Sequence, residues 1–262
     1  MASLLDLSPI LSGLPIPAWR AFAQIGSTND EALRWAEAGA ADLSLVLAEE
    51  QTAGRGRLGR SWYTPSGAAL AVSLILRPRP AEQRWPARLT ALAALALVQV
   101  IRAQAPSLEV GIKWPNDVLV NEKKVAGVLV EALWQGDQPQ AFILGMGVNV
   151  LKAARPPLSE QAFPATTLED EMGEPPGRDR LLRAWLEALL SWRARLGEPT
   201  FLQAWEQAML WRGRMLEVQS GDGQTLTGRW IGLEADGRLR LQTAEGIHSL
   251  PFGEVQLRPH PS

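Results

Sequence analysis

Residues 51–62 read Gln-Thr-Ala-Gly-Arg-Gly-Arg-Leu-Gly-Arg-Ser-Trp, and residues 113–117 read Lys-Trp-Pro-Asn-Asp. The first stretch combines three glycines, three arginines and a tryptophan. Glycines let backbone N–H groups turn towards a phosphate, arginines add charge and paired donors, and a tryptophan can close on an apolar ligand. Ser61 is the one conventional nucleophile in the stretch, so we predict an active-site loop that holds a reactive anion, such as an adenylate, rather than attacking it.

Simpler interpretations stand beside each motif. Residues 54–60 fit a solvated surface loop or an RNA-binding arginine-glycine segment, although a single copy in an acidic chain disfavours the latter. They are not a P-loop, because the Gly-Lys-Ser/Thr ending is missing. An ordinary Pro-Asn-Asp turn explains residues 115–117 but not the preceding Lys-Trp. Residues 27–29, Ser-Thr-Asn, fit simple capping of a helix as well as ligand binding.

Composition excludes several classes of protein. The chain has 262 residues, 46% of them hydrophobic, which is enough for one full-sized domain and a small one. With 26 basic and 28 acidic side chains it has no overall basic field for DNA or an anionic membrane. Cysteine is absent and histidine occurs twice, which argues against disulfides and against thiolate or histidine-rich metal sites.

We find no signal-peptide pattern and expect a cytoplasmic protein. The apolar window 89–101 is too short to span a bilayer, so we expect a buried helix.

Lysine is scarce, at four positions against 22 for arginine, yet Lys113, Lys123 and Lys124 lie close together in the sequence. An ammonium is a compact point charge, unlike the planar guanidinium. The cluster therefore indicates positions that need an ammonium, with a coding bias against lysine as the alternative.

Hydrophobic patterns predict an α+β fold. We expect helices at 29–38, 85–103, 178–196 and 198–210, and strands at 43–49, 68–76, 109–114, 117–120, 124–133 and 141–146. The short connections 121–122 and 135–139 imply hairpins and a largely antiparallel sheet. Strands at 215–219, 225–231, 239–243 and 247–251, separated by glycine turns, predict a small, partly closed SH3-like β-barrel. The expected domains are 1–212 and 213–262.

Together, five motifs resemble those of the biotin protein ligases in order and spacing. They are Ser27-Thr-Asn29, Gly54-Arg-Gly-Arg-Leu-Gly-Arg-Ser-Trp62, Lys113-Trp-Pro-Asn-Asp117, Lys124-Val-Ala-Gly-Val-Leu-Val-Glu131 and Gly145-Met-Gly-Val-Asn149. The resemblance covers about residues 21–258. It implies a mixed, largely antiparallel sheet with flanking helices, similar to class II aminoacyl-tRNA synthetase cores, followed by the SH3-like barrel. It begins near residue 19, so we expect no N-terminal DNA-binding domain.

The resemblance also implies roles for individual residues. Biotin would be held by Ser27, Thr28, Asn29, Gln51, Arg55, Gly56, Arg57, Lys124, Gly127 and Leu129. Nucleotide would be held by Arg55, Arg57, Trp62, Lys113, Asn116, Asp117 and Asn149. Lys113 and Arg57 would act in catalysis, and Glu254 and Arg258 are weaker candidates for contact with nucleotide or acceptor.

The implied reaction joins biotin to ATP with Mg²⁺, giving biotinyl-5′-adenylate and pyrophosphate. A lysine of a biotin carboxyl carrier protein domain of a carboxylase then attacks the adenylate. Ligands for the metal are not identified. A lipoate–protein ligase, which shares the fold and the adenylate chemistry, and a non-catalytic RNA-binding module are the alternatives.

Overall fold

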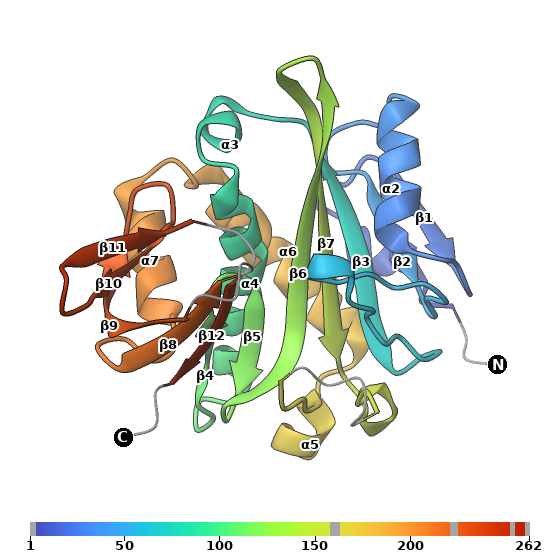
Figure 1. Cartoon of the computed structure of the whole chain (residues 1–262). Coiled ribbons are helices and arrows are strands. Elements are labelled where there is room, and N and C mark those ends of the chain that lie inside the picture. The colour runs from blue at the N-terminus through green and yellow to red at the C-terminus, as the bar shows by residue number, and fades with distance from the viewer. Residues whose placement is uncertain (1–3, 158–162, 221–224, 252–254, 260–262) are drawn as a thin grey trace.

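The computed structural model describes residues 4–157, 163–220, 225–251 and 255–259. A large mixed sheet forms the centre of the molecule and a smaller sheet packs beside it (Figure 1). The large sheet has the strand order β1-β2-β3-β7-β6-β5-β4. Its strands are β1 Trp19–Phe22, β2 Leu45–Ala48, β3 Ala69–Leu76, β4 Val110–Lys113, β5 Asp117–Val120, β6 Lys123–Gln135 and β7 Gln138–Asn149.

All neighbouring strands of the large sheet run antiparallel except β1 and β2, which are parallel. The prediction of a largely antiparallel sheet is therefore confirmed, and β1 is an element that the hydrophobic pattern missed. Its burial is weak, with two exposed and two half-buried residues, so it carries no strong apolar signal. The hairpin between β6 and β7 is tighter than expected, because Gln135 already pairs with Gln138 around Gly136 and Asp137.

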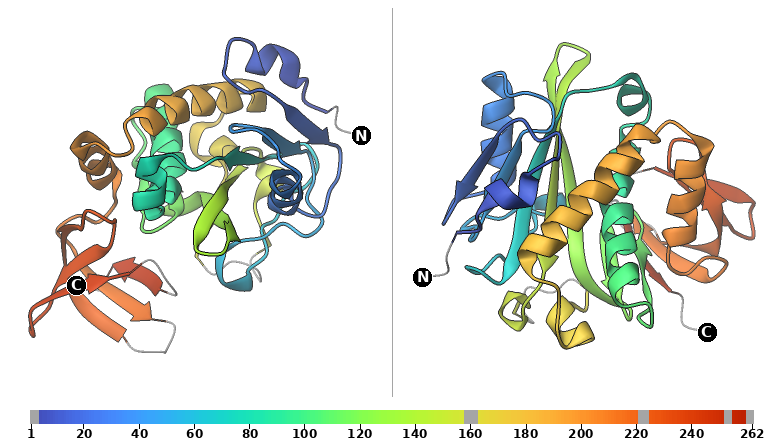
Figure 2. Two further views of the ribbon diagram at one scale, coloured as in Figure 1. Left: turned by 90° about the horizontal axis from the view of Figure 1, so that it is seen from above. Right: turned by 180° about the vertical axis from the view of Figure 1, so that it is seen from behind.

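Helices cover both faces of the large sheet (Figure 2). On one face lies α2, Thr28–Glu37, whose Ala32 and Ala36 pack with Val46 and Ile75 of the sheet. The other face carries the main core, built around α4, Ala87–Gln104, and α6, Arg178–Ala194. Every residue of β2 and β3 is buried, since both faces of these strands are covered. Their sequences are accordingly continuous apolar runs rather than alternating ones.

The remaining helices are α1 Leu7–Leu11, α3 Pro80–Arg84, α5 Leu168–Met172 and α7 Pro199–Ala208. By length and composition alone, α4 is apolar enough to cross a membrane. It lies inside the fold, however, with 67% of the residues in this helix buried. The expectation of a buried helix is therefore confirmed.

The smaller sheet has the order β11-β10-β9-β8-β12. Its strands are β8 Met215–Ser220, β9 Thr225–Leu233, β10 Leu239–Gln242, β11 Ile247–Leu250 and β12 Val255–Pro259. Within the described residues β11 and β12 are the two edges of an open sheet, so the predicted partly closed SH3-like barrel is not confirmed. The sheet is fastened to the rest of the molecule, because Trp114 Nε1 donates to the carbonyl oxygen of Gly237 at 3.1 Å and Leu233 N donates to Glu206.

A buried ion pair joins α6 to the segment before α4. Arg193 Nε lies 2.5 Å from Glu82 Oε1, and both side chains are 1% exposed. We expect Arg193→Met to lower the free energy of unfolding by about 3–5 kcal/mol, because it leaves the Glu82 charge buried without its partner. Arg34→Met, which breaks an exposed pair with Glu31, is the control and is expected to leave the free energy of unfolding almost unchanged. Urea unfolding measures both, and equal losses would contradict the prediction.

Candidate active site

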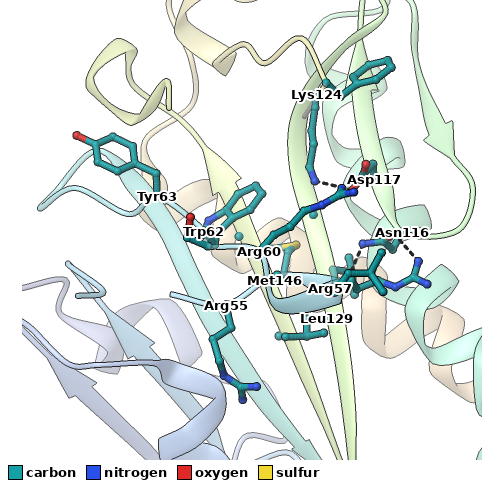
Figure 3. Close-up of a pocket in the computed structure, with 18 of the residues that line it drawn as sticks. Arg55, Arg57, Arg60, Trp62, Tyr63, Asn116, Asp117, Lys124, Leu129 and Met146 are labelled. Atoms are coloured by element: carbon teal, nitrogen blue, oxygen red, sulfur yellow. Dashed lines mark hydrogen bonds and ion pairs between the residues drawn. The ribbon is translucent and has the colours of Figure 1, made fainter. Parts of the chain in front are cut away.

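One cavity of about 460 Å³ opens between the large sheet, the loop 51–62 and strand β12 (Figure 3). The residues predicted to hold biotin or nucleotide all line it: Ser27, Thr28, Asn29, Gln51, Arg55, Gly56, Arg57, Trp62, Lys113, Asn116, Asp117, Lys124, Gly127, Leu129 and Asn149. The loop links β2 to β3, and its central turn, Arg57–Gly59, is a short 3₁₀ helix. The fold thus brings residues from five separate motifs to one cavity.

One end of the cavity is polar and uncharged. Ser27 caps α2, with its hydroxyl accepting a hydrogen bond from Asp30 N. Gln51 Oε1 accepts from both the backbone N and the hydroxyl of Thr28, at 2.8 and 3.0 Å. Gln51 Nε2 in turn donates to Thr64 Oγ1 at 3.1 Å. For the motif Ser27-Thr-Asn29, helix capping and ligand binding are therefore compatible interpretations, because the same residues begin α2 and line the cavity.

Ser73 is a residue of this end that the sequence analysis missed. Its hydroxyl is fully buried and lies 2.8 Å from Thr28 Oγ1 and 2.7 Å from Asn29 Oδ1. A buried hydroxyl without a hydrogen-bond partner is costly, so a serine in the core signals a polar neighbour. That signal is present in the sequence of β3, where Ser73 is the one hydroxyl in an otherwise apolar strand.

Glycines of β6 and β7 let aromatic and amide groups lie against the sheet backbone. A side chain at Gly147 would collide with the indole of Trp62, and one at Gly145 would collide with the amide of Asn29. A side chain at Gly127 would come within 3.2 Å of the Trp62 ring. The buried Trp62 Nε1 has no hydrogen-bond partner among the described residues. The Gly-x-Gly motif therefore has a steric explanation, because it leaves room for the indole of Trp62 and the amide of Asn29.

Arg55 is paired with carboxylates. Its guanidinium donates to Glu131 Oε1 and Oε2 at 2.9 and 2.7 Å and to Asp30 Oδ1 at 2.6 Å. The hydrogen bonds to Glu131 are the main reason that the pKa of Arg55 is raised above its usual value. In Figure 3 this side chain points away from Arg57, Arg60 and Lys124. Glu131 is a second residue whose place in this network the sequence analysis did not predict.

The other end of the cavity is cationic. Asp117 lies between two ammonium groups, 2.7 Å from Lys124 Nζ and 3.5 Å from Lys113 Nζ. Burial lowers the pKa of Lys113, against the opposing effect of Asp117. Burial alone would raise the pKa of Asp117, but Lys124 and Lys113 together hold it below its usual value. The carboxylate stays ionised at neutral pH and neutralises one of the two lysines, so the group as a whole attracts an anion.

Further basic groups surround the lysine pair. Arg57 Nη1 donates to Asn116 Oδ1 at 3.0 Å, while Asn116 Nδ2 donates to the carbonyl oxygen of Val128 at 3.0 Å. Burial lowers the pKa of Arg57. Arg60 also lines the cavity, and Figure 3 shows it extending towards Asp117 and Lys124. It is the third arginine of the loop, and the sequence analysis gave it no role.

At the edges of the site, Asn149 lines the cavity but also donates to the carbonyl oxygen of Thr166 at 3.1 Å. Arg258 reaches the cavity from β12, together with Leu257. Glu254 lies outside the described residues. Phe163 was not predicted either, and its ring centre is 4.8 Å from Lys113 Nζ. Sequence spacing gives no hint of Phe163, since it comes from a proline-rich surface segment.

Among the described residues no group of three or more His, Cys, Asp or Glu side chains is arranged to hold a metal ion. The carboxylate at the cationic end, Asp117, is already paired with two lysines. The cavity therefore provides neutral hydrogen-bonding groups at one end, an aromatic wall, and concentrated positive charge at the other. This arrangement suits a ligand with a polar head, an apolar body and an acidic tail that becomes joined to a phosphate.

Residues 21–149 match the profile of a class of ligases, the Biotin/lipoate A/B protein ligase family. Residues 213–258 match the profile of the Biotin protein ligase C terminal domain. The biotin--[acetyl-CoA-carboxylase] ligase of Paracoccus denitrificans is 36% identical over 238 residues, 89% of this chain and 98% of the relative. The chain belongs to the biotin protein ligase family.

Two further comparisons support membership of this family. The bifunctional ligase/repressor BirA of Bacillus spizizenii is 35% identical over 239 residues, which is 89% of this chain and 72% of the relative. The solved structure of the biotin protein ligase from Aquifex aeolicus in complex with biotin and ATP has a TM-score of 0.79 and 28% identity, covering 94% of this chain and all of the other. The observed arrangement of sheets is therefore that of a biotin protein ligase.

The close contact between Gly147 and Trp62 yields a prediction. We expect Gly147→Ala to weaken biotin binding at least about tenfold, because the added methyl group displaces the indole that forms the cavity wall. Gly26→Ala is the matched control, since a side chain there meets no atom within 4 Å. Isothermal titration calorimetry measures both affinities. If the two variants bind biotin equally well, the indole does not form the wall that we describe.

Proposed function

We propose that this chain is an ATP-dependent biotin–protein ligase. In the first step the biotin carboxylate attacks the α-phosphate of ATP, forming biotinyl-5′-adenylate and releasing pyrophosphate. In the second, an acceptor lysine attacks the mixed anhydride, forming an amide and releasing AMP. The observation that carries the proposal is the single cavity with an uncharged polar end and a cationic end, in a chain 36% identical to a biotin--[acetyl-CoA-carboxylase] ligase.

The uncharged end suits the ureido head of biotin. A ureido group has one carbonyl acceptor and two N–H donors, which the hydroxyls of Ser27 and Thr28 and the amide of Gln51 complement. Gly127, Leu129 and Trp62 would line the slot for the apolar bicycle. This division of polar and apolar groups is what a small-molecule site requires.

The cationic end suits the carboxylate and the α-phosphate. Lys113 is 13% exposed, and a cation in such a poorly solvated place gains more from an incoming anion than it would in water. We assign Lys113 to the negative charge that builds up in both steps, and Lys124 to the biotin carboxylate. Arg57 and Asn116, already hydrogen-bonded to each other, would bind the phosphate, with Asp117 holding the two ammonium groups apart.

ATP enters these reactions as a magnesium complex, so we propose Mg²⁺ as the cofactor. The described residues do not form a cage for it. Mg²⁺ usually keeps several waters and binds through phosphates with few protein ligands, so phosphate oxygens would supply most of its coordination. The protein's contribution is then the fixed charge of Lys113, Lys124 and Arg57.

For the second substrate we propose the biotin carboxyl carrier domain of a carboxylase, acting in the cytoplasm. An acceptor lysine has to reach the anhydride from the open side of the cavity, next to the loop 51–62 and strand β12. We propose the neighbouring C-terminal sheet, whose Leu257 and Arg258 line the cavity, as a contact for nucleotide or acceptor.

Substrate identity is tested by biotin-dependent exchange of pyrophosphate into ATP. We expect exchange with biotin and none with lipoate, because lipoate has no ureido group to pair with Ser27, Thr28 and Gln51, and a site that loses such partners discriminates strongly. Transfer of biotin to a purified carrier domain checks the second step. Exchange with lipoate at a similar rate would overturn the assignment of biotin.

The role of Lys113 is tested by Lys113→Ala. We expect kcat for pyrophosphate exchange to fall at least about a hundredfold, because a cation fixed near the developing charge contributes several kcal/mol to the transition state. Lys113→Arg should rescue little, since a planar guanidinium does not fit the position of an ammonium. Thermal unfolding within a few degrees of the unmodified protein checks that the fold survives. Near-normal exchange in the alanine variant would remove Lys113 from the mechanism.

A further inference from the structure

Two of the residues that line the uncharged end of the cavity are held by one carboxylate. Arg55, on the loop, meets Glu131 through two parallel hydrogen bonds of 2.9 and 2.7 Å. Asn29, on α2, donates its Nδ2 to Glu131 Oε2 at 2.8 Å. The loop and the helix are 76 and 102 residues away from Glu131 in the sequence. A single side chain of β6 therefore connects both walls of the cavity.

Asn29 has its N–H groups occupied by protein acceptors. Besides Glu131, Nδ2 lies 3.4 Å from the carbonyl oxygen of Leu129. Oδ1 is 2.7 Å from the hydroxyl of Ser73, and Gly145 leaves the space that this amide fills. The side chain is buried, with the residue 5% exposed. The N–H groups of Asn29 are therefore committed to protein acceptors, which fits a supporting role for this side chain.

Arg55 is likewise committed to protein groups. Its charge is matched by Glu131 and by Asp30, which lies 2.6 Å away on α2. A guanidinium bound in two-point fashion by a carboxylate is held in a defined orientation. Its side chain also points away from Arg57 and Lys124 (Figure 3), which line the cationic end of the cavity together with Lys113.

We infer that Glu131 is a positioning residue of the biotin end, which fixes the loop through Arg55 and α2 through Asn29, and that neither Arg55 nor Asn29 binds the reacting anion. The inference rests on the proposed function for the identity of the ligand. Breaking the network lets the loop and the helix drift apart, so the groups facing the ureido head lose their spacing. The chemistry at the cationic end, which has its own cations, keeps its arrangement.

The test is a double-mutant cycle with Glu131→Gln and Arg55→Met, read by pyrophosphate exchange. Each single change is expected to raise KM for biotin at least about tenfold while kcat at saturating biotin and ATP changes less than about threefold. The double variant is expected to raise KM by less than the product of the two single effects, because both changes remove the shared contact between Glu131 and Arg55. Arg34→Met, which breaks an exposed pair on the same helix, is the control and is expected to leave both constants unchanged.

Two kinetic outcomes overturn the inference. One is a loss of kcat of tenfold or more in Arg55→Met, which would place Arg55 on the reacting groups. The other is a double variant whose KM equals the product of the two single effects, which would show that the two residues act independently. The absence of biotin-dependent exchange in the unmodified protein would instead refute the proposed function.

A measurement without substrate tests the positioning role whether or not the unmodified protein shows biotin-dependent exchange. Trypsin cleavage after Arg57 reports whether the loop is held in the empty protein, and a mass spectrum identifies the fragments. We expect Glu131→Gln and Arg55→Met each to speed this cleavage at least about fivefold, because each releases the loop from β6. A rate equal to that of the unmodified protein would overturn the positioning role, whatever the substrate.

Discussion

The site depends on the close approach of side chains to the backbone of β7. Trp62 and Asn29 occupy the space that side chains at positions 147 and 145 would otherwise fill. A strand that is paired on both sides and lacks these two side chains offers a flat backbone surface between β3 and β6. The loop can then close over the sheet through its indole, and α2 can present its first turn to the same cavity. Without this surface, neither Trp62 of the loop nor Asn29 of α2 could pack against β7.

Charge is distributed unevenly along the cavity, so that one end suits a neutral group and the other an acidic group. At the end lined by Ser27, Thr28 and Gln51, the positive charge of Arg55 is offset by the carboxylates of Glu131 and Asp30, so this end has no excess of positive charge. At the other end, the two lysines around Asp117 leave an excess of positive charge in a poorly solvated place. A ligand with a neutral head and an acidic tail is oriented by this difference alone. The same difference brings its carboxylate to the groups that stabilise the adenylate.

Much of the fold was predictable because hydrophobic patterns are local. The strands β2, β3, β5 and β6, and the helices α2, α4, α6 and α7, lie within a few residues of their predicted positions. The strand β1 and the helix α1 were missed, because short, partly exposed elements carry a weak pattern. Strand β12 was not predicted as a separate element. The partly closed SH3-like barrel was not confirmed among the described residues, since closure depends on how strands pair, and the pattern of each strand does not specify that.

For the site, the sequence by itself determined the chemical groups: the glycine-arginine loop, the isolated Lys-Trp motif and the polar residues that begin α2. Their order and spacing were sufficient to identify the family, because such motifs are short and contiguous. Only the tertiary structure decided which of these groups face each other. Ser73 and Glu131 entered the site by proximity, since their partners lie far away in the sequence, and Arg60 by the direction in which its side chain extends. Whether an arginine binds a ligand or a neighbouring carboxylate depends on distances that folding sets, and a linear motif does not contain them.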